Sequence, residues 1–361
     1  MVNNMKRIMF YINVIDGGGA ERVMTNLSSQ FADNGYQVTF VTSYPAEIEY
    51  RLNKKIKRFN LEEKQNNTSK ISRNIGRIIR LRELIKEEKP DLLVTFMGEP
   101  NFRGVIAKIG LKTKVVVSVR NDPNKEYGGK VMRFVGKVIL PFADGCVFQT
   151  EDAKKWFPEK LQRKSTVIWN AVNEDFYKIL RSPVKGLVVS CGRLQPQKNQ
   201  KMLISAIKQV YENNPNVRLN IYGSGNLESE LTSYINELGM KNVITLKGQT
   251  SNVAEVLKKA DIFVMSSDYE GMPNALMEAM ASGVPCISTD CPCGGPKMLI
   301  TDREEGILVN TNDEIGLAKA IEELLSNDNL KEYLSIQAKN KAISFRSDAI
   351  FNQWVSYIER L

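Results

Sequence analysis

The stretch DIFVMSSDYEGMPNALMEAMASGVPCIST, residues 261–289, contains one complete unit of an α/β fold. Residues 261–267 form an apolar run typical of a buried strand, and residues 284–289 form another. Between them, Pro273 suits the first position of a helix that continues until Gly283 stops it. This order and spacing predict two parallel strands joined by a helix.

Apolar runs separated by helical patterns recur along the chain and fall into two series. The first series extends from residues 6–15 to residues 165–172, and the second from residues 186–194 to residues 284–289. Alternation of strands and helices is typical of a parallel sheet covered by helices on both faces. The sequence therefore predicts two doubly wound α/β domains, with a linker near Pro183.

Composition excludes several classes of protein. With 361 residues, 42% of them hydrophobic and 25% charged, the chain can build full cores and is typical of a soluble protein. It contains no apolar run of the ~20 residues that a membrane span needs, and no secretory signal is recognisable. The absence of histidine excludes Ser–His and Cys–His nucleophiles and histidine-containing zinc motifs. The five cysteines have no zinc-ribbon spacing, and we expect reduced thiols in a cytoplasmic protein.

Positive charge is concentrated in the first half of the chain. Up to Pro183 there are 32 Lys/Arg against 20 Asp/Glu, and beyond it 18 against 21. Within residues 51–89, a helical pattern places isoleucines on one face and Arg73, Arg77 and Arg80 on the opposite face. Two interpretations stay open, a solvated basic face or a contact with anionic lipid headgroups or an anionic acceptor.

Two loops that follow predicted strands could bind an anion. DGGGAERV, residues 16–23, is not a dinucleotide fingerprint because Arg22 stands in place of a third glycine. Its glycines would still let the backbone approach a ligand, although a tight turn is the alternative. In SCGRLQPQKNQ, residues 190–200, Arg193 and Lys198 could bind a diphosphate, and ordinary surface charge is the alternative.

Two glutamates surround the start of the helix within residues 261–289. Glu270 lies in the turn at the carboxyl end of a strand, and Glu278 lies two helical turns later. Carboxylates accept hydrogen bonds from vicinal sugar hydroxyls, and the amides of the first helical turn, near Asn274, could bind a phosphate. The alternative is that both glutamates are surface acids around a core helix.

Together these motifs resemble a known family. In order along the chain they read GGGAERV, GRLQPQKN, WNAV, YEGMPNALMEAMASGVP and TDCPCGGPKMLI. This resembles the retaining glycosyltransferases of family 4 over nearly the whole chain, and the glutamate pair is its most specific element. The resemblance implies a GT-B fold, in which two doubly wound Rossmann-like domains face each other across a donor/acceptor cleft. It implies an acceptor domain (1–182), a nucleotide-sugar domain (183–345) and a final helix (346–361) that crosses back through Phe351, Trp354 and Tyr357.

The resemblance also implies a role for each matching residue. Arg193 and Lys198 would bind the donor diphosphate and act in catalysis with Glu270, which would contact the transferred sugar. Glu278 would accept hydrogen bonds from the ribose. The remaining donor contacts would come from Gly18, Gly19, Gly248, Gly271, Asn274, Ala275 and Leu276.

The implied mechanism needs neither histidine nor metal. In the family, attack and departure are thought to occur on the same face of the sugar, and the leaving diphosphate takes the proton of the acceptor. Arg193, Lys198 and a helix N-terminus would stabilise the growing negative charge, so we expect no cofactor. Many relatives carry a histidine in the loop that here contains Arg120 and Asn121, which we assign to the transferred sugar or acceptor.

The resulting hypothesis is transfer of a hexose or N-acetylhexosamine from a UDP-sugar to a saccharide acceptor linked to polyprenyl diphosphate, in surface-glycan assembly. We expect the protein at the inner face of the cell membrane, where Arg73, Arg77 and Arg80 would contact anionic lipid. A soluble acceptor is the alternative within the same fold. A nicotinamide dehydrogenase is disfavoured by the incomplete fingerprint. Nucleic-acid binding is disfavoured because the basic segment 51–89 has Phe59 as its only aromatic residue.

Overall fold

The chain forms two compact units, each built around one parallel sheet. The computed structural model describes residues 7–47, 49–62 and 69–361. The first unit comprises Met1–Asn170 with Ile350–Leu361, and the second comprises Ala171–Ala349. The two units are described separately below.

The segment between the two series of strands belongs to the second unit. The Ser182 amide donates to the Lys258 carbonyl (2.9 Å), and the Arg181 guanidinium donates to the Gly283 carbonyl (2.7 Å). Residues 171–182, which the sequence analysis placed in the first domain, are therefore tied to the second unit by hydrogen bonds. The sequence boundary was placed from the positions of proline and glycine residues, which do not reveal such long-range hydrogen bonds.

The first unit contains a seven-stranded sheet in the order β3-β2-β1-β4-β5-β6-β7, and every neighbouring pair of strands is parallel. The strands are β1 (Arg7–Ile12), β2 (Gln37–Thr42), β3 (Lys57–Asn60), β4 (Leu92–Phe96), β5 (Lys114–Ser118), β6 (Gly145–Phe148) and β7 (Ser165–Val167). The helices are α1 (Gly19–Asp33), α2 (Lys70–Glu88), α3 (Gly98–Ala107), α4 (Pro123–Glu126), α5 (Lys130–Ile139), α6 (Glu151–Lys155) and α7 (Glu159–Gln162), with the 3₁₀ turn η1 (Leu140–Phe142) after α5.

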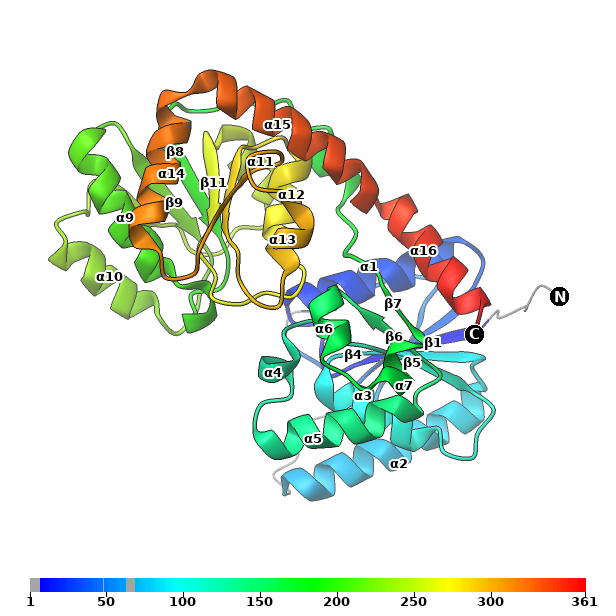
Figure 1. The fold of residues 1–361 in the computed structure, drawn as a ribbon. Coiled ribbons are helices and arrows are strands. Elements are labelled where there is room, and N and C mark those ends of the chain that lie inside the picture. Colours follow the sequence, from blue (N-terminus) through cyan, green and yellow to red (C-terminus); the bar gives the residue numbers. More distant parts are fainter. Residues whose placement is uncertain (1–6, 48, 63–68) are drawn as a thin grey trace. The chain divides into compact units, whose positions relative to one another are not determined.

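Helices cover both faces of this sheet. Figure 1 shows α1 and α16 (Ser347–Glu359) on one side, and α2, α3 and α5 on the other. The central strands are consequently buried along their length, as in β4, where all five residues are buried. Three aromatic side chains of α16 pack into the first unit, through the contacts Phe351–Phe31 (ring centroids 4.9 Å apart), Trp354–Phe96 (6.1 Å) and Tyr357–Cys146 (amide to hydroxyl, 2.8 Å). These are the side chains that the family resemblance implied.

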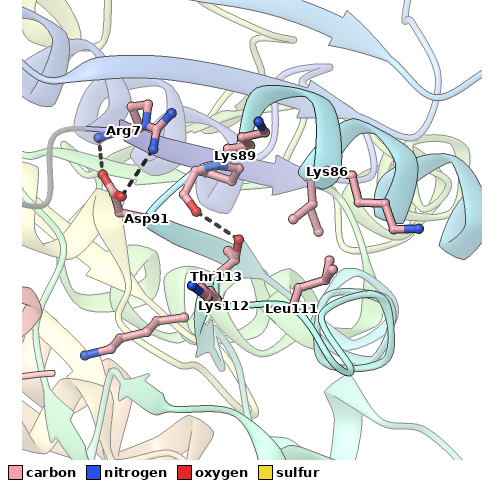
Figure 2. Close-up of a pocket in the computed structure, with 10 residues that line it drawn as sticks. Arg7, Lys86, Lys89, Asp91, Leu111, Lys112 and Thr113 are labelled. Atoms are coloured by element: carbon pink, nitrogen blue, oxygen red, sulfur yellow. Dashed lines mark hydrogen bonds and ion pairs between the residues drawn. The ribbon is translucent and has the colours of Figure 1, made fainter.

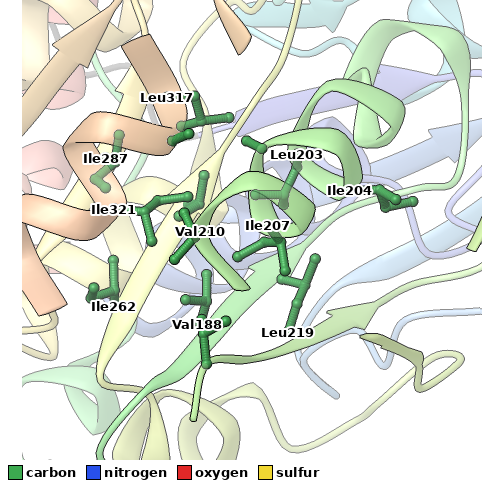
Figure 3. Packing of buried hydrophobic residues seen from close by; sticks show 14 of the residues in the cluster. Val188, Leu203, Ile204, Ile207, Val210, Leu219, Ile262, Ile287, Leu317 and Ile321 are labelled. Atoms are coloured by element: carbon green, nitrogen blue, oxygen red, sulfur yellow. The ribbon is translucent and has the colours of Figure 1, made fainter. Parts of the chain in front are cut away.

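The second unit contains a six-stranded sheet in the order β10-β9-β8-β11-β12-β13, with all pairs parallel. The strands are β8 (Leu187–Cys191), β9 (Arg218–Tyr222), β10 (Ile244–Leu246), β11 (Ile262–Met265), β12 (Cys286–Thr289) and β13 (Ile307–Val309). The helical elements are α8 (Glu174–Tyr177), η2 (Pro196–Lys198), α9 (Gln200–Asn213), α10 (Glu228–Glu237), α11 (Val253–Lys259), α12 (Asn274–Ala281), α13 (Gly295–Leu299), α14 (Glu314–Ser326), α15 (Asp328–Ala342) and η3 (Ile343–Phe345). Figure 3 shows part of the core, where Val188 and Leu219 of the sheet meet Ile207 of α9 and Ile321 of α14.

In both sheets the strand order reverses beside the first strand. The chain moves outward from β1 to β3 and then returns to place β4 on the other side of β1. In the second unit β11 returns in the same way beside β8. In such open sheets the ligand crevice lies outside the carboxyl ends of the two strands at the reversal. For the second unit, this points to the loops that follow β8 and β11.

Helix α2 lies in the opposite orientation to the one we predicted. Arg77, which we predicted to face solvent, points inward and is 6% exposed. Its guanidinium donates two hydrogen bonds to the buried Glu62 carboxylate (2.9 and 3.1 Å). Arg80 also donates to Glu62 (2.9 Å), and Arg73 is only partly exposed. The isoleucines face solvent instead, with Ile71 74% exposed. The three arginines therefore form no outward stripe, because a buried carboxylate needs positive partners.

We predict that Arg77→Ala lowers the free energy of unfolding by roughly 3 kcal/mol, since it leaves Glu62 buried with less compensation. Arg80→Ala is the matched control. Its side chain is 43% exposed, so its loss is expected to cost about 1 kcal/mol or less. Denaturant titration of both variants measures the difference. An equal or larger effect of Arg80→Ala would contradict the assignment of Arg77 as the main partner.

Candidate active site

The loops at the carboxyl ends of β8 and β11 meet through an ion pair. Lys198 ends the short turn η2 after β8, and Glu270 lies in the loop after β11. The Lys198 ammonium lies 2.5 Å from Glu270 Oε1, and the two side chains are 19% and 9% exposed. Glu270 Oε1 also accepts a hydrogen bond from the Ser267 hydroxyl (2.7 Å). Two predicted catalytic residues are thus brought together at the strand reversal of the second sheet.

The position of Glu270 is held by its backbone. Its amide donates to the Pro292 carbonyl (2.6 Å), and its carbonyl accepts from the Cys293 amide (2.9 Å). Gln197 adds a bond from its side chain to the Tyr269 carbonyl (2.9 Å). The motif TDCPCGGP, which the sequence analysis quoted without a structural role, therefore supports the loop that carries Glu270.

Glu278 lies on α12, the helix that follows this loop. The helix begins after Pro273, and its first backbone bond runs from the Met277 amide to the Pro273 carbonyl (3.1 Å). Residues Asn274, Ala275 and Leu276 form the first turn of this helix, directly after the loop that carries Glu270. The amides of a first helical turn, with the positive end of the helix dipole, favour an anionic group.

The Glu278 carboxylate is buried and lies near the end of β8. It is 6% exposed, and its negative charge acts on the Cys191 thiol. Burial, with a smaller contribution from Glu278, raises the pKa of Cys191 to about 12. Cys191 is therefore a neutral thiol at physiological pH. The contact of Glu278 with a donor ribose stays a prediction.

Arg193 lies in the loop after β8, and a glycine allows this loop to pack closely against the loop after β9. Arg193 is exposed, while the adjacent Leu194 is buried. A Cβ atom on Gly223 would lie 2.0 Å from the Gly192 carbonyl oxygen, so only glycine permits this backbone contact. Sequence reasoning missed Gly223, although its place directly after an apolar strand was a usable signal. Gly248, a predicted donor contact, accepts from the Gly223 amide (2.8 Å) and lies in the loop after β10.

Gly295→Ala is expected to damage the site through the backbone. An added Cβ atom would lie 1.7 Å from the Gly271 carbonyl oxygen and 3.1 Å from Pro273 Cδ. Because backbone atoms cannot move aside as a flexible side chain can, we expect kcat/KM to fall by ~10² or more through displacement of the Glu270 loop. Gly129→Ala is the control, since nothing lies within 4 Å of its added Cβ. Steady-state kinetics of a folded Gly295→Ala with unchanged activity would contradict this role.

In the first unit, the predicted residues lie at the carboxyl ends of β1 and β5. Gly18 is the N-cap of α1 in the glycine turn after β1, and Gly19 is the first residue of that helix. Arg120 and Asn121 follow β5, but the Arg120 guanidinium is buried. It lies over the Phe96 ring at 4.3 Å and donates to Ser118 and Asn170. The structure therefore brings these side chains to the expected edge of the sheet. Their roles towards a sugar stay a prediction.

A buried carboxylate controls the conformation of this loop. Glu126 Oε2 accepts hydrogen bonds from the amides of both Arg120 and Asn121 (2.9 Å each). Burial raises the pKa of Glu126 to about 7, although the two amides and the Arg120 charge act in the opposite direction. Sequence reasoning missed Glu126 because one glutamate within a short charged segment has no distinctive pattern.

This raised pKa predicts a pH dependence of stability. The pKa of Glu126 is about 7 in the folded chain and is ordinarily 4.5. Between these two pH values, the folded state therefore binds more protons than the unfolded state does. The free energy of unfolding contributed by Glu126 should therefore fall as pH rises from about 4.5 to about 7, by on the order of 3 kcal/mol. Denaturant titrations of the wild type and Glu126→Gln across this range test it. The exposed Glu151→Gln is the control, and equal pH profiles for all three proteins would contradict the prediction.

A second network, around Arg103, lies at the strand reversal of the first sheet. Arg103 of α3 is 2% exposed and donates to Glu99 (2.6 Å), Asn13 (2.7 Å) and the Tyr11 hydroxyl (3.0 Å). Asn13 directly follows β1. Sequence reasoning did not single out these residues, because they are far apart in the chain and match no motif. They fix polar side chains at the carboxyl edge of the first sheet.

One pocket of the first unit is separate from these sites. It has a volume of about 560 Å³ and is lined by Arg7 and Lys114 at the amino ends of β1 and β5, by Lys112 before β5, and by Lys86 in the last turn of α2. Figure 2 shows Asp91 paired with Arg7 at its edge, with an Nη2–Oδ1 distance of 3.7 Å. Because parallel α/β sheets bind ligands at the carboxyl ends of their strands, this pocket is at the opposite edge from the candidate site.

Both units match known families of glycosyltransferases. Residues 17–176 match the family described as "Glycosyltransferase Family 4", and residues 172–341 match "Glycosyl transferases group 1". Two doubly wound units with these matches define a glycosyltransferase. The chain belongs to glycosyltransferase family 4, since a relative of known activity also aligns along its full length.

That relative is the GalNAc-alpha-(1->4)-GalNAc-alpha-(1->3)-diNAcBac-PP-undecaprenol alpha-1,4-N-acetyl-D-galactosaminyltransferase of Campylobacter jejuni, 30% identical over 98% of each chain. The chain is also 28% identical, over 74% of each chain, to the UDP-Gal:alpha-D-GlcNAc-diphosphoundecaprenol alpha-1,3-galactosyltransferase of Escherichia coli.

Solved structures share the fold. HepE from Anabaena, in complex with UDP and glucose, superposes with a TM-score of 0.83 at 17% identity, covering 99% of this chain and 100% of HepE. Sucrose-phosphate synthase from Thermosynechococcus elongatus gives 0.85 at 17% identity, covering 98% of each chain. The predicted GT-B fold class is confirmed by these similarities and by the two parallel sheets.

Proposed function

We propose that the protein is a retaining glycosyltransferase that transfers a hexose or N-acetylhexosamine from a UDP-sugar to a saccharide linked to polyprenyl diphosphate, in surface-glycan assembly. The observation that carries the proposal is the Lys198–Glu270 pair (2.5 Å) at the strand reversal of the second sheet, with Glu278 on the next helix. The names of the Campylobacter and Escherichia relatives support the lipid-linked acceptor. The solved complexes of HepE with UDP support a uridine donor.

In the proposed reaction, the C1–O bond between the sugar and the β-phosphate breaks, and the acceptor oxygen bonds to C1 on the same face. The acceptor proton passes to an oxygen of the leaving diphosphate, so the products are UDP and the extended saccharide. Arg193, Lys198 and the amides at the start of α12 stabilise the charge that grows on the diphosphate. Glu270 contacts the sugar as its positive charge develops, and Glu278 binds the ribose.

We also propose that the reaction needs no metal ion, because two cations and a helix N-terminus already serve the diphosphate. The protein is proposed to act at the cytoplasmic face of the cell membrane, where a lipid-linked acceptor is reached. No helix within the described residues combines the length and hydropathy that a membrane span requires.

The test is a transfer assay with purified protein, a panel of UDP-hexoses and UDP-N-acetylhexosamines, and a short-chain polyprenyl-diphosphate saccharide. We expect one donor to give an extended product with unchanged anomeric configuration by NMR, and activity to persist in EDTA. An inverted product would contradict the retaining mechanism, and loss of activity in EDTA would contradict metal independence. Transfer to soluble saccharides alone would contradict the lipid-linked acceptor.

A further inference from the structure

Helix α5 exposes a row of apolar side chains to solvent. Val131, Phe134 and Val138 are 74%, 68% and 47% exposed, and their spacing of three and four residues places them along one face. Phe142, in the turn that follows the helix, is 61% exposed and continues the apolar surface. Single exposed apolar residues are ordinary, but a contiguous set that includes two phenylalanines is typical of an interaction surface.

A row of basic side chains runs beside the apolar row. Lys130, Arg133 and Lys137 each precede one of the three apolar residues, so both rows follow the same direction along the helix. No acidic residue occurs in 127–143. Lys160 lies with its ammonium 4.8 Å from the centre of the Phe142 ring, which adds positive charge at the other end of the surface. The α5 surface is thus amphipathic and uniformly positive.

Helix α2 exposes an apolar row of its own. Ile71, Ile75 and Ile79 are 74%, 54% and 51% exposed. The buried helix α3 contacts both α2 and α5, and Figure 1 shows the two outer helices on the same side of the first sheet. The inward orientation of Arg77 is what turns these isoleucines outward. We name the exposed residues of α5, η1 and α2 together the α5/α2 face.

We propose that the α5/α2 face docks onto the surface of an anionic lipid bilayer. The apolar rows enter the boundary between headgroups and acyl chains, and the lysines of α5 contact lipid phosphates, as in interfacial amphipathic helices. A second copy of the chain fits less well, because a two-fold interface would place the same basic row against itself. The proposal deepens the proposed function, since a lipid-linked acceptor lies in such a surface.

The test is sedimentation of the full chain with vesicles of phosphatidylcholine, alone or mixed with phosphatidylglycerol, at low and high salt. We expect binding to the mixed vesicles only. Phe134→Asp with Val138→Asp should weaken this binding by about tenfold or more, because it places charge in the apolar row. Lys130→Glu with Lys137→Glu should weaken it and reduce its salt dependence. Ile315→Asp in the second unit, at a residue 60% exposed, is the matched control and should bind as the wild type does.

A spectroscopic variant makes the contact visible directly. Phe134→Trp should shift its fluorescence to shorter wavelength on mixed vesicles, and Ile315→Trp should not. Binding indifferent to the α5 changes would overturn the proposal, and so would a dimer in sedimentation equilibrium that these changes dissociate. Transfer to a short-chain acceptor in detergent is measured in parallel. Loss of vesicle binding with intact transfer supports the docking surface, whereas absence of transfer in the wild type would count against the proposed function instead.

Discussion

Replacing Lys198 or Arg193 by alanine is expected to lower kcat/KM by ~10²–10³, the scale of one lost charge-stabilising group. Lys198 is held 2.5 Å from Glu270 at the carboxyl end of the second sheet, and Arg193 leaves the same loop as an exposed side chain. Negative charge on the diphosphate is greater in the transition state than in the bound donor, so the loss should appear in kcat more than in KM.

The ion pair adds a further expectation for Lys198. Its removal leaves the Glu270 carboxylate, which is 9% exposed, with the Ser267 hydroxyl as the nearer remaining partner. The double variant Lys198→Ala/Glu270→Ala should therefore lose less kcat/KM than the product of the two single losses, because each single change already disturbs the other residue. The corresponding Arg193 and Glu270 changes should combine more nearly independently.

Steady-state kinetics of the single and double variants measure both expectations. Lys201→Ala is the matched control, because Lys201 is the second residue of α9 and forms an exposed ion pair with Glu230. It should retain wild-type activity. Wild-type kcat/KM in folded Arg193→Ala and Lys198→Ala would show that neither residue serves the diphosphate.

The second large effect separates the two glutamates. Glu270→Ala is expected to lower kcat by ~10² with little change in UDP affinity, because we propose that Glu270 contacts the sugar as its charge develops. Glu278→Ala should weaken UDP binding about 10–100-fold, which corresponds to ~1.5–3 kcal/mol for hydrogen bonds to a charged group. The structure is consistent with this division, since Glu270 lies in a loop beside Lys198 whereas Glu278 lies on α12 near Cys191.

Calorimetric titration with UDP, together with kcat for each variant, tests the division. Glu237→Ala, at an exposed position of α10, is the control for removing a carboxylate from the second unit. If Glu270→Ala lost UDP binding while Glu278→Ala retained it, the two roles would be reversed. Equal losses of both properties in both variants would instead indicate general damage to the loop.

The local sequence pattern was enough to predict the central strands of both sheets. Residues 91–97 and 261–267 read as apolar runs because parallel central strands are buried on both faces, and they became β4 and β11. Strands β3 and β13 were not predicted. Each lies at an edge of its sheet and has one neighbouring strand, and the four residues of β3 include no fully buried one.

The candidate donor residues were also accessible from the sequence. Each lies within a few residues of a strand end, and the carboxyl ends of strands in a doubly wound sheet meet at one edge. Arg193, Glu270 and Glu278 could therefore be grouped before their distances were known. The contact between Lys198 and Glu270, and the support of the Glu270 loop by Pro292 and Cys293, required the folded chain.

The orientation of α2 was decided by tertiary structure alone. Its periodicity separates isoleucines from arginines, but periodicity does not say which face is covered. The carboxylate of Glu62, which precedes the helix, decides the orientation, because without Arg77 the buried charge would have only the more exposed Arg80 as its cationic partner. The sequence by itself determined the two sheets and the loops that carry the donor site. Long-range pairing, whose partners no local pattern reveals, determined which side chains face inward and which face solvent.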